Sequence, residues 1–264
     1  MKKVAIIGAG VMGTIFLKVI QSMKGWQGIS IADHRLIKLQ ALKKFSKVIT
    51  TTDNIRASQS ADLIILAVKP QSFLEVAKEL KNNISEDCLI ISIMAGVSIK
   101  KIRKELGIEK IIRAMPNLGA KLGKSMTVWT SAKKLVIDEK KIVKSLFDKI
   151  GASLYVNNEE LIDKATAVSG SGPGFFFYII ERWLKAIEKF GFAKAESKLM
   201  LLVTIDAANE LLQKEKDPET LKNQVTSKGG TTEAGLKMLD NCDFKKIWNK
   251  VLQAAYKRAR QLSR

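Results

Sequence analysis

The 264-residue chain has one histidine, two cysteines and four prolines, and the first two shortages remove whole classes of site. Cys88 and Cys242 are too few for a disulfide framework or a thiolate metal centre, so we expect a reducing, cytoplasmic compartment and no bound metal. With His34 as the only imidazole, a zinc site of several histidines is excluded, and a Ser-His-Asp triad would need that one residue. The chemistry must come largely from backbone groups, hydroxyls, carboxylates, basic side chains or a cofactor.

Acidic residues are also scarce, with 26 Asp and Glu against 45 Lys and Arg, a net charge of +19. Such an excess is typical of nucleic-acid binding, of affinity for small anions, or of a solvated basic surface. The lysines are dispersed, except that residues 244–264 carry seven basic residues and no acid. No nucleic-acid motif accompanies them, so we expect no nucleic-acid partner. No apolar run approaches the ~18 residues that span a membrane, so we expect no membrane partner.

The N-terminal segment carries a nucleotide-binding pattern. Residues 4–7 form a short apolar run typical of a buried strand, Gly8-Ala9-Gly10-Val11-Met12-Gly13 follows, and a helical pattern continues to Met23. In this context the three glycines permit a tight turn, close approach of a pyrophosphate, and close packing of helix on strand. The phosphates then lie at the helix N-terminus. A tight strand-to-helix turn without a ligand is the alternative.

The end of the second strand leaves the choice of dinucleotide open. The run 29–32 ends at Asp33, twenty residues after Gly13, where a carboxylate accepts hydrogen bonds from the ribose 2′-hydroxyl of NAD. Arg35 follows closely and can instead pair with the 2′-phosphate of NADP. Both NADH and NADPH therefore remain candidates.

The remaining pattern divides the chain into two parts. Further strand-like runs lie at 47–50, 62–68, 88–93, 110–114, 126–129 and 154–156, with helical patterns between several of them. They predict an α/β fold, a Rossmann-type, doubly wound, mostly parallel sheet over residues 1–158. Residues 159–264 are predicted to be all-helical, with helices at 174–190, 199–212, from Asp217-Pro218, 232–239 and 244–262. Segment 199–212 is apolar on nearly every face, so we expect it to be buried on all sides at a subunit interface.

Two glycine-rich segments of the second part, 169–174 and 226–232, are predicted to be turns that each open a helix. Their backbone N–H groups and hydroxyls suit a small carboxylate ligand. Simple helix capping by Ser and Thr is the alternative. Segments 67–70 and 113–117 end strand-like runs, at the sheet edge where ligands of open α/β sheets bind.

Together these segments resemble pyrroline-5-carboxylate reductase. The matching stretches are 6–13, 67–70, 92–97, 112–117, 168–173 and 221–239 with its Gly-Gly-Thr-Thr. The resemblance implies reduction of the cyclic imine 1-pyrroline-5-carboxylate to L-proline with NADPH or NADH, the last step of proline biosynthesis. It also implies a homo-oligomer, either a dimer or a dimer-based ring, and a substrate-binding and dimerisation role for residues 159–264.

The resemblance also implies residue roles. The cofactor would contact Gly8, Gly10, Val11, Met12, Gly13, Asn54, Val68, Lys69, Pro70 and Ala95, with Asp33 or Arg35 at the ribose. Ser227, Gly230 and Thr231 would hold the substrate carboxylate, Thr232 would be catalytic through its hydroxyl near the ring nitrogen, and Glu215 would lie near the amine. Hydride transfer to an imine needs placement of two carbons and a hydrogen bond to the nitrogen, which agrees with the shortage of histidine.

The chain departs from the family pattern at Gly119, Asn223, Gln224, Lys228 and Gly174. These departures keep two alternatives open, a reductase of a different imine and a non-enzymatic regulator that binds the cofactor without turnover. A β-hydroxyacid dehydrogenase shares the two-domain plan. Its Lys and Asn, one helical turn apart after the glycine-rich turn, have no counterpart in 175–180.

Overall fold

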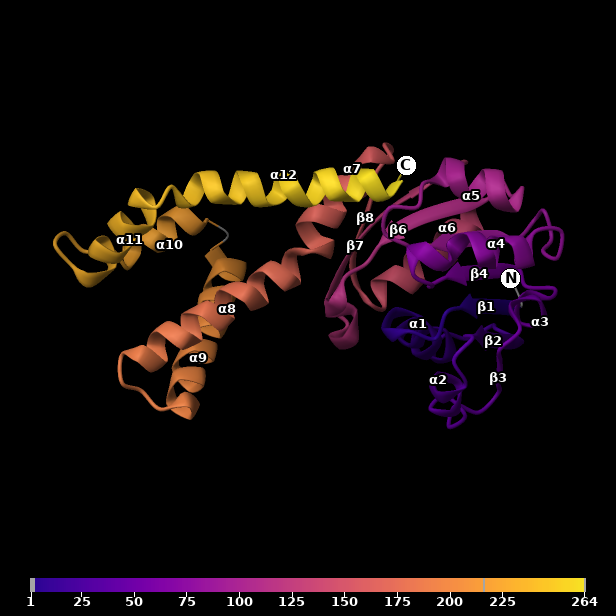
Figure 1. The fold of residues 1–264 in the computed structure, drawn as a ribbon, viewed down its shortest axis with the longest axis horizontal. Helices are drawn as coiled ribbons and strands as arrows, with labels where there is room; N and C mark the ends of the chain where they lie inside the picture. The colour runs from indigo at the N-terminus through magenta and orange to yellow at the C-terminus, as the bar shows by residue number, and fades with distance from the viewer. Residues whose placement is uncertain (1–2, 216, 264) are drawn as a thin grey trace. The chain divides into compact units, whose positions relative to one another are not determined.

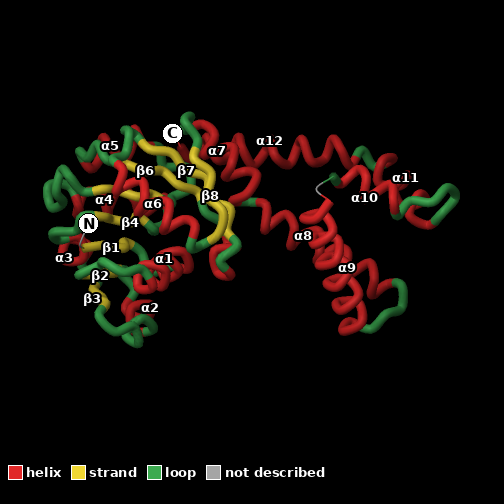
Figure 2. The backbone as a smooth tube through the Cα atoms, turned by 180° about the vertical axis from the view of Figure 1, so that it is seen from behind, coloured by secondary structure: helices red, strands yellow, loops and turns green. Residues whose placement is uncertain are grey.

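The computed structural model describes residues 3–215 and 217–263, and the chain divides into two compact units. The first unit comprises Met1–Pro173 together with Ala254–Arg264, and the second comprises Gly174–Gln253. Figures 1 and 2 show a sheet flanked by helices in the first unit and helices alone in the second. The sequence pattern groups residues 159–173 with the helical part, whereas in the structure they belong to the first unit, which contains the sheet.

The first unit is built on an eight-stranded sheet in the order β3-β2-β1-β4-β5-β6-β7-β8. Every neighbouring pair is parallel except β6 and β7. Each strand overlaps a run predicted from the sequence, and the predicted fold class is confirmed. The strands are β1 (Lys3–Ile7), β2 (Gly28–Ala32), β3 (Val48–Thr51), β4 (Leu63–Leu66), β5 (Leu89–Ser92), β6 (Ile111–Met115), β7 (Ser125–Ser131) and β8 (Gly151–Tyr155).

Helices cover both faces of this sheet, which explains why its central strands are continuous apolar runs. One apolar cluster joins Ile6 and Ile65 to Phe16 and Phe147, whose rings meet edge to face at 6.5 Å. The other cluster lies on the opposite face, around Phe73. The first face is covered by α1 (Val11–Ser22), α2 (Leu36–Gln40) and α6 (Ile137–Asp148), and the second by α3 (Asn54–Ser58), α4 (Phe73–Leu80) and α5 (Ile99–Leu106). The short helices η1 (Pro70–Ser72) and η2 (Leu118–Leu122) follow β4 and β6.

The glycine-rich segment 169–174, predicted to be a turn, is helical. It lies in a helical run of α7 (Glu160–Ala165), the π-helical η3 (Thr166–Gly170) and α8 (Gly172–Lys189). The backbone N–H of Ser171 donates to the carbonyl of Thr166, five residues earlier, at 2.8 Å, and the Ser171 hydroxyl donates to the same oxygen. These bonds keep the chain helical where its glycines alone predict a break.

The second unit contains most of α8, with α9 (Lys194–Glu215), α10 (Pro218–Gln224), α11 (Thr231–Asn241) and the first part of α12 (Phe244–Ser263). The predicted start of α10 is confirmed, because Asp217 is its N-cap and accepts a hydrogen bond from the Thr220 N–H. Segment 199–212 is not buried on all sides within the single chain, so its predicted burial at a subunit interface stays a prediction. Leu199 is 66% exposed and Val203 60%, because the other helices of the unit cover only part of the apolar circumference of α9. Within the described residues, no helix is long and apolar enough to cross a membrane.

A buried ion cluster ties β6 to α7 and to the start of α5. Arg113 is fully buried and donates through Nη1 to Glu159 and through Nη2 to Asp163, at 2.9 and 2.5 Å. The same Glu159 oxygen accepts the backbone N–H of Ile99 at 2.8 Å. Breaking a buried ion pair is costly because it leaves uncompensated charge in the interior.

We therefore expect Arg113→Met to lower the free energy of unfolding by about 3–5 kcal/mol, measured by urea denaturation. The triple change Arg113→Met, Glu159→Gln, Asp163→Asn should recover much of that loss, because it removes the stranded charges. Lys144→Met is the control: its pair with Asp148 is exposed, so its effect should stay below about 1 kcal/mol. Equal losses from Lys144→Met and Arg113→Met would contradict the prediction.

Candidate functional site

The glycine-rich loop between β1 and α1 is shaped by two close backbone contacts. Gly8 has a φ of +106°, and a β-carbon there would lie 2.7 Å from the carbonyl oxygen of Ala67. A β-carbon on Gly13 would lie 1.9 Å from the carbonyl oxygen of Gly8. Gly10, the N-cap of α1, has open space where its β-carbon would be. The first turn of α1 therefore presents free backbone N–H groups beside an open space, which suits a phosphate.

A cleft of about 670 Å³ opens beside this loop, at the carboxyl ends of β1, β2 and β4. It brings together most of the residues predicted to contact a cofactor: Gly8, Gly10, Val11, Met12, Asp33, Arg35, Asn54, Val68 and Lys69. The other three predicted residues do not line it. Gly13 is packed beneath the loop, Pro70 is the first residue of η1, and Ala95 follows β5.

Further residues line the cleft without having been predicted: His34, Lys38, Ser72, Glu75 and Glu79 among them. Asn54 donates through Nδ2 to a carboxylate oxygen of Glu79 at 2.8 Å, which joins α3 to α4. The two glutamates are four residues apart on α4, so one face of that helix carries both. Helical spacing after a predicted strand is the only sequence signal that could have found them.

Asp33 lies at the end of β2, and its carboxylate is turned inward. Oδ2 accepts from the Ala9 N–H at 3.0 Å and from Lys38 Nζ at 2.7 Å. Oδ1 accepts from the Arg35 N–H at 3.0 Å and from Arg35 Nε at 3.4 Å. Burial alone would raise the pKa of Asp33, but the hydrogen bonds from Lys38, Arg35 and Ala9 outweigh it, so the pKa is lowered and the carboxylate is charged.

The residues predicted to hold the substrate form a separate group in the second unit. Ser227, Gly230, Thr231 and Thr232 lie in the turn before α11 and in its first residues, so this segment opens a helix as predicted. Gly230 is the N-cap and has no side-chain cap, so the first N–H groups of α11 keep no intrahelical partner. Glu233 accepts a hydrogen bond from the Gly229 N–H and pairs with Lys237, so it links the turn to the first two turns of α11.

Glu215, predicted to lie near the substrate amine, is the last residue of α9. Its carboxylate accepts a hydrogen bond from Gln224 Nε2 at 3.3 Å, which joins α9 to the end of α10. The cofactor group belongs to the first unit and the substrate group to the second. Among the described residues, no cluster of three His, Cys, Asp or Glu side chains could hold a metal ion.

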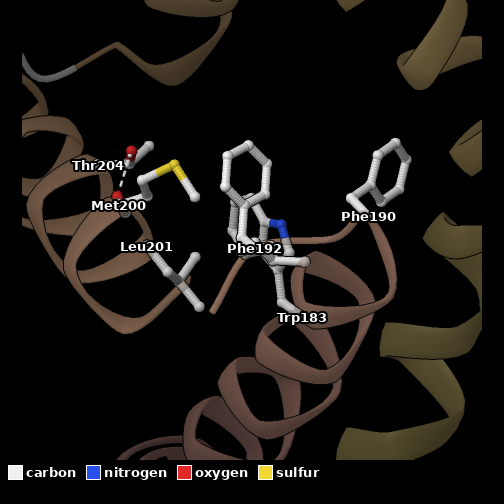
Figure 3. Close-up of a pocket in the computed structure, with 7 residues that line it drawn as sticks. Trp183, Phe190, Phe192, Met200, Leu201 and Thr204 are labelled. Carbon is white, nitrogen blue, oxygen red and sulfur yellow. Dashed lines mark hydrogen bonds between the residues drawn. The ribbon is translucent and has the colours of Figure 1, made fainter. Parts of the chain in front are cut away.

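The second unit also has an apolar pocket of about 220 Å³ between α8 and α9 (Figure 3). Trp183 of α8 lies there with Phe190 and Phe192 of the following loop, opposite Met200 and Leu201 of α9. The Thr204 hydroxyl donates to the Met200 carbonyl and is thus occupied within the helix. None of the predicted site residues lines this pocket.

Comparison with known proteins connects both groups to one family. Residues 159–262 match the family described as pyrroline-5-carboxylate reductase dimerisation, and residues 3–96 match NADP oxidoreductase, coenzyme F420-dependent. The pyrroline-5-carboxylate reductase of Synechocystis is 33% identical, over 99% of this chain and 98% of its own. The chain belongs to the pyrroline-5-carboxylate reductase family.

Solved structures of this reductase family have the same fold. The enzyme of Coxiella burnetii is 33% identical with a TM-score of 0.87, covering 99% of this chain and 98% of its own. The Plasmodium falciparum pyrroline carboxylate reductase, solved with NADP bound, is 27% identical with the same TM-score, covering 100% of this chain and 98% of its own. The family predicted from the sequence is thereby confirmed.

The loop geometry predicts different outcomes for two glycine substitutions in this reductase. Gly13→Ala should lower the free energy of unfolding by more than about 2 kcal/mol, because the new methyl meets backbone that cannot give way. Gly10→Ala should cost only about 1 kcal/mol, since its site is open and its φ is allowed. Its methyl would nevertheless occupy the space above the loop, so binding of NADPH, measured by fluorescence titration, should weaken about tenfold or more. Unchanged binding by a folded Gly10→Ala variant would contradict this account of the cleft.

Proposed function

We propose that this chain reduces 1-pyrroline-5-carboxylate to L-proline with NADPH or NADH, the last step of proline biosynthesis, in the cytoplasm. The observation that carries the proposal is the match to pyrroline-5-carboxylate reductases over nearly the whole of both chains. The cleft beside the glycine-rich loop and the open N-terminus of α11 support it independently, because they suit the two anions that the reaction needs.

The cleft fits a nicotinamide dinucleotide. No atom lies within 4 Å of the place where a β-carbon on Gly10 would be, and the N-terminus of α1 borders the same space. A pyrophosphate can therefore contact the backbone directly. Val68 and Lys69, after β4, and Asn54, at the start of α3, line the remainder in our assignment. When bound, the cofactor supplies a hydride, so the protein needs no covalent nucleophile.

The N-terminus of α11 holds the substrate in our assignment. Ser227, Gly230 and Thr231 bind the carboxylate through backbone N–H groups and hydroxyls, with the helix dipole favouring its negative charge. The Thr232 hydroxyl hydrogen-bonds the ring nitrogen, which takes one proton from water as its C=N carbon receives the hydride. Glu215 lies near the resulting amine. Lys228, exposed in the same turn, adds positive charge near the carboxylate.

Residues 159–264 form the substrate-binding and dimerisation half in this proposal, and residues 1–158 the cofactor half. The family match over 159–262 supports a homo-oligomer. The apolar residues that α8 and α9 leave exposed, among them Phe177, Leu199 and Val203, give such an assembly its driving force. We propose a homodimer, alone or as the building unit of a ring.

Turnover tests the role of Thr232. Thr232→Ala should reduce kcat about 10²-fold with both cofactors while the far-ultraviolet spectrum and cofactor binding stay unchanged, because a single hydrogen bond to the reacting nitrogen is lost. Thr232→Ser should keep most of the activity.

Thr226→Ala is the matched control, since the Thr226 hydroxyl is already occupied by the carbonyl of Lys222. Cofactor binding by the unmodified protein with no turnover of 1-pyrroline-5-carboxylate would refute the reductase and favour the regulatory alternative.

Sedimentation tests the assembly. The unmodified chain should sediment as a dimer or a multiple of dimers, and Val203→Glu should shift it towards the monomer by burying a charge in the interface. Lys194→Glu, at the N-terminus of the same helix, should leave the assembly intact, because an acid there complements the helix dipole. A monomeric unmodified chain would contradict the proposed dimer.

A further inference from the structure

Asp33 occupies the position from which a carboxylate usually accepts hydrogen bonds from the ribose of NAD. Its carboxylate is not available for that task. A carboxylate has about four lone-pair positions, and four donors from Ala9, Arg35 and Lys38 already approach the two oxygens. Although Asp33 lines the cleft, its side chain is only 5% exposed, so a ribose hydroxyl meets no free acceptor on it.

The side chains that do face the cleft next to Asp33 are basic. Arg35 is half exposed, and its side chain contacts Asp33 through Nε alone among the described residues, so its two terminal nitrogens remain for a ligand. His34 is 81% exposed, and Lys38 also lines the cleft. Glu75 and Glu79 line the cleft from α4, and in the described part of the chain neither is ion-paired with Arg35, His34 or Lys38. A planar guanidinium with free N–H groups matches a phosphate group.

We propose that Asp33 is a positioning residue that orients Arg35 and Lys38, and that these two side chains select the 2′-phosphate of NADPH. This inference rests on the proposed function only in taking the cleft as the dinucleotide site. Asp33 thus favours NADPH, whereas an acid at its place in the sequence usually favours NAD. By accepting from Lys38 and from the Arg35 backbone, it holds two cations at the rim and withdraws its own charge from the ligand.

Lys38 determines whether Asp33 favours the 2′-phosphate of NADPH or the 2′-hydroxyl of NADH. It makes the shortest contact to Asp33, at 2.7 Å, and it is the only lysine that pairs with this carboxylate among the described residues. Without its ammonium group, Oδ2 regains a lone pair, and Asp33 keeps only the longer contact with Arg35 to compensate its charge. The freed carboxylate can then accept from a 2′-hydroxyl, and it repels a 2′-phosphate.

Binding of two half-ligands tests the inference without turnover. Titration calorimetry with adenosine 2′,5′-bisphosphate and with 5′-AMP isolates the 2′-phosphate on the full-length chain. The unmodified protein should bind the bisphosphate at least about tenfold more tightly, the ratio expected from one charge-assisted contact. Arg35→Gln should remove most of that ratio by weakening the bisphosphate alone. Lys38→Met should lower the ratio further, and Lys38→Arg should restore it.

Two exposed residues outside the cleft are matched controls, since Lys43→Met and Arg56→Gln remove the same charges and should leave both affinities unchanged. Asp33→Asn should not weaken 5′-AMP more than the bisphosphate. Equal binding of the two half-ligands by the unmodified protein, or a selective loss of 5′-AMP in Asp33→Asn, would overturn the inference. Inactivity towards 1-pyrroline-5-carboxylate with the ratio intact would instead refute the proposed function alone.

Discussion

The backbone contact between Gly8 and Gly13 is the constraint on which the cofactor half depends. The carbonyl oxygen of Gly8 occupies the space of a β-carbon on residue 13, so the end of β1 and the first turn of α1 meet with no side chain between them. This contact places the N-terminus of α1 at the carboxyl edge of the sheet. It also brings the Ala9 N–H within reach of Asp33, so the loop and the end of β2 are fixed by one carboxylate.

The two units obtain their stability in different ways. In the first, helices cover both faces of a mostly parallel sheet, and two large apolar clusters are buried within one chain. In the second, only Leu201 and Ser197 of the 22 residues of α9 are buried, and large apolar side chains remain in contact with water. In the proposed dimer, such a helix would gain hydrophobic free energy on association, which would couple the folding of this half to assembly.

The strands could be predicted because buried parallel strands are continuous apolar runs. The nucleotide loop could be predicted because Gly8 and Gly13 leave no room for a β-carbon and Gly10 leaves space for a ligand. The rest depends on contacts between residues that a pattern does not connect. The inward turn of Asp33 requires Lys38, which reaches it only once α2 has formed. The π-turn at Thr166–Gly170 requires Ser171 to prefer a carbonyl five residues earlier. The pattern of 199–212 correctly indicates an apolar helix, but it cannot say whether the cover comes from the same chain.

The scarcity of acid in the composition becomes more pronounced at the surface of the first unit. Asp33, Glu139 and Asp163 are all buried. They accept hydrogen bonds from the Ala9 N–H, the Val136 N–H and the Arg113 guanidinium, respectively. Acids held inside contribute little to the field outside, while most lysines remain exposed. The exposed charge of the chain is therefore predominantly basic, in line with its net charge of +19. Since both proposed ligands are anions, this placement favours their approach over distances of about a Debye length, before any specific contact forms.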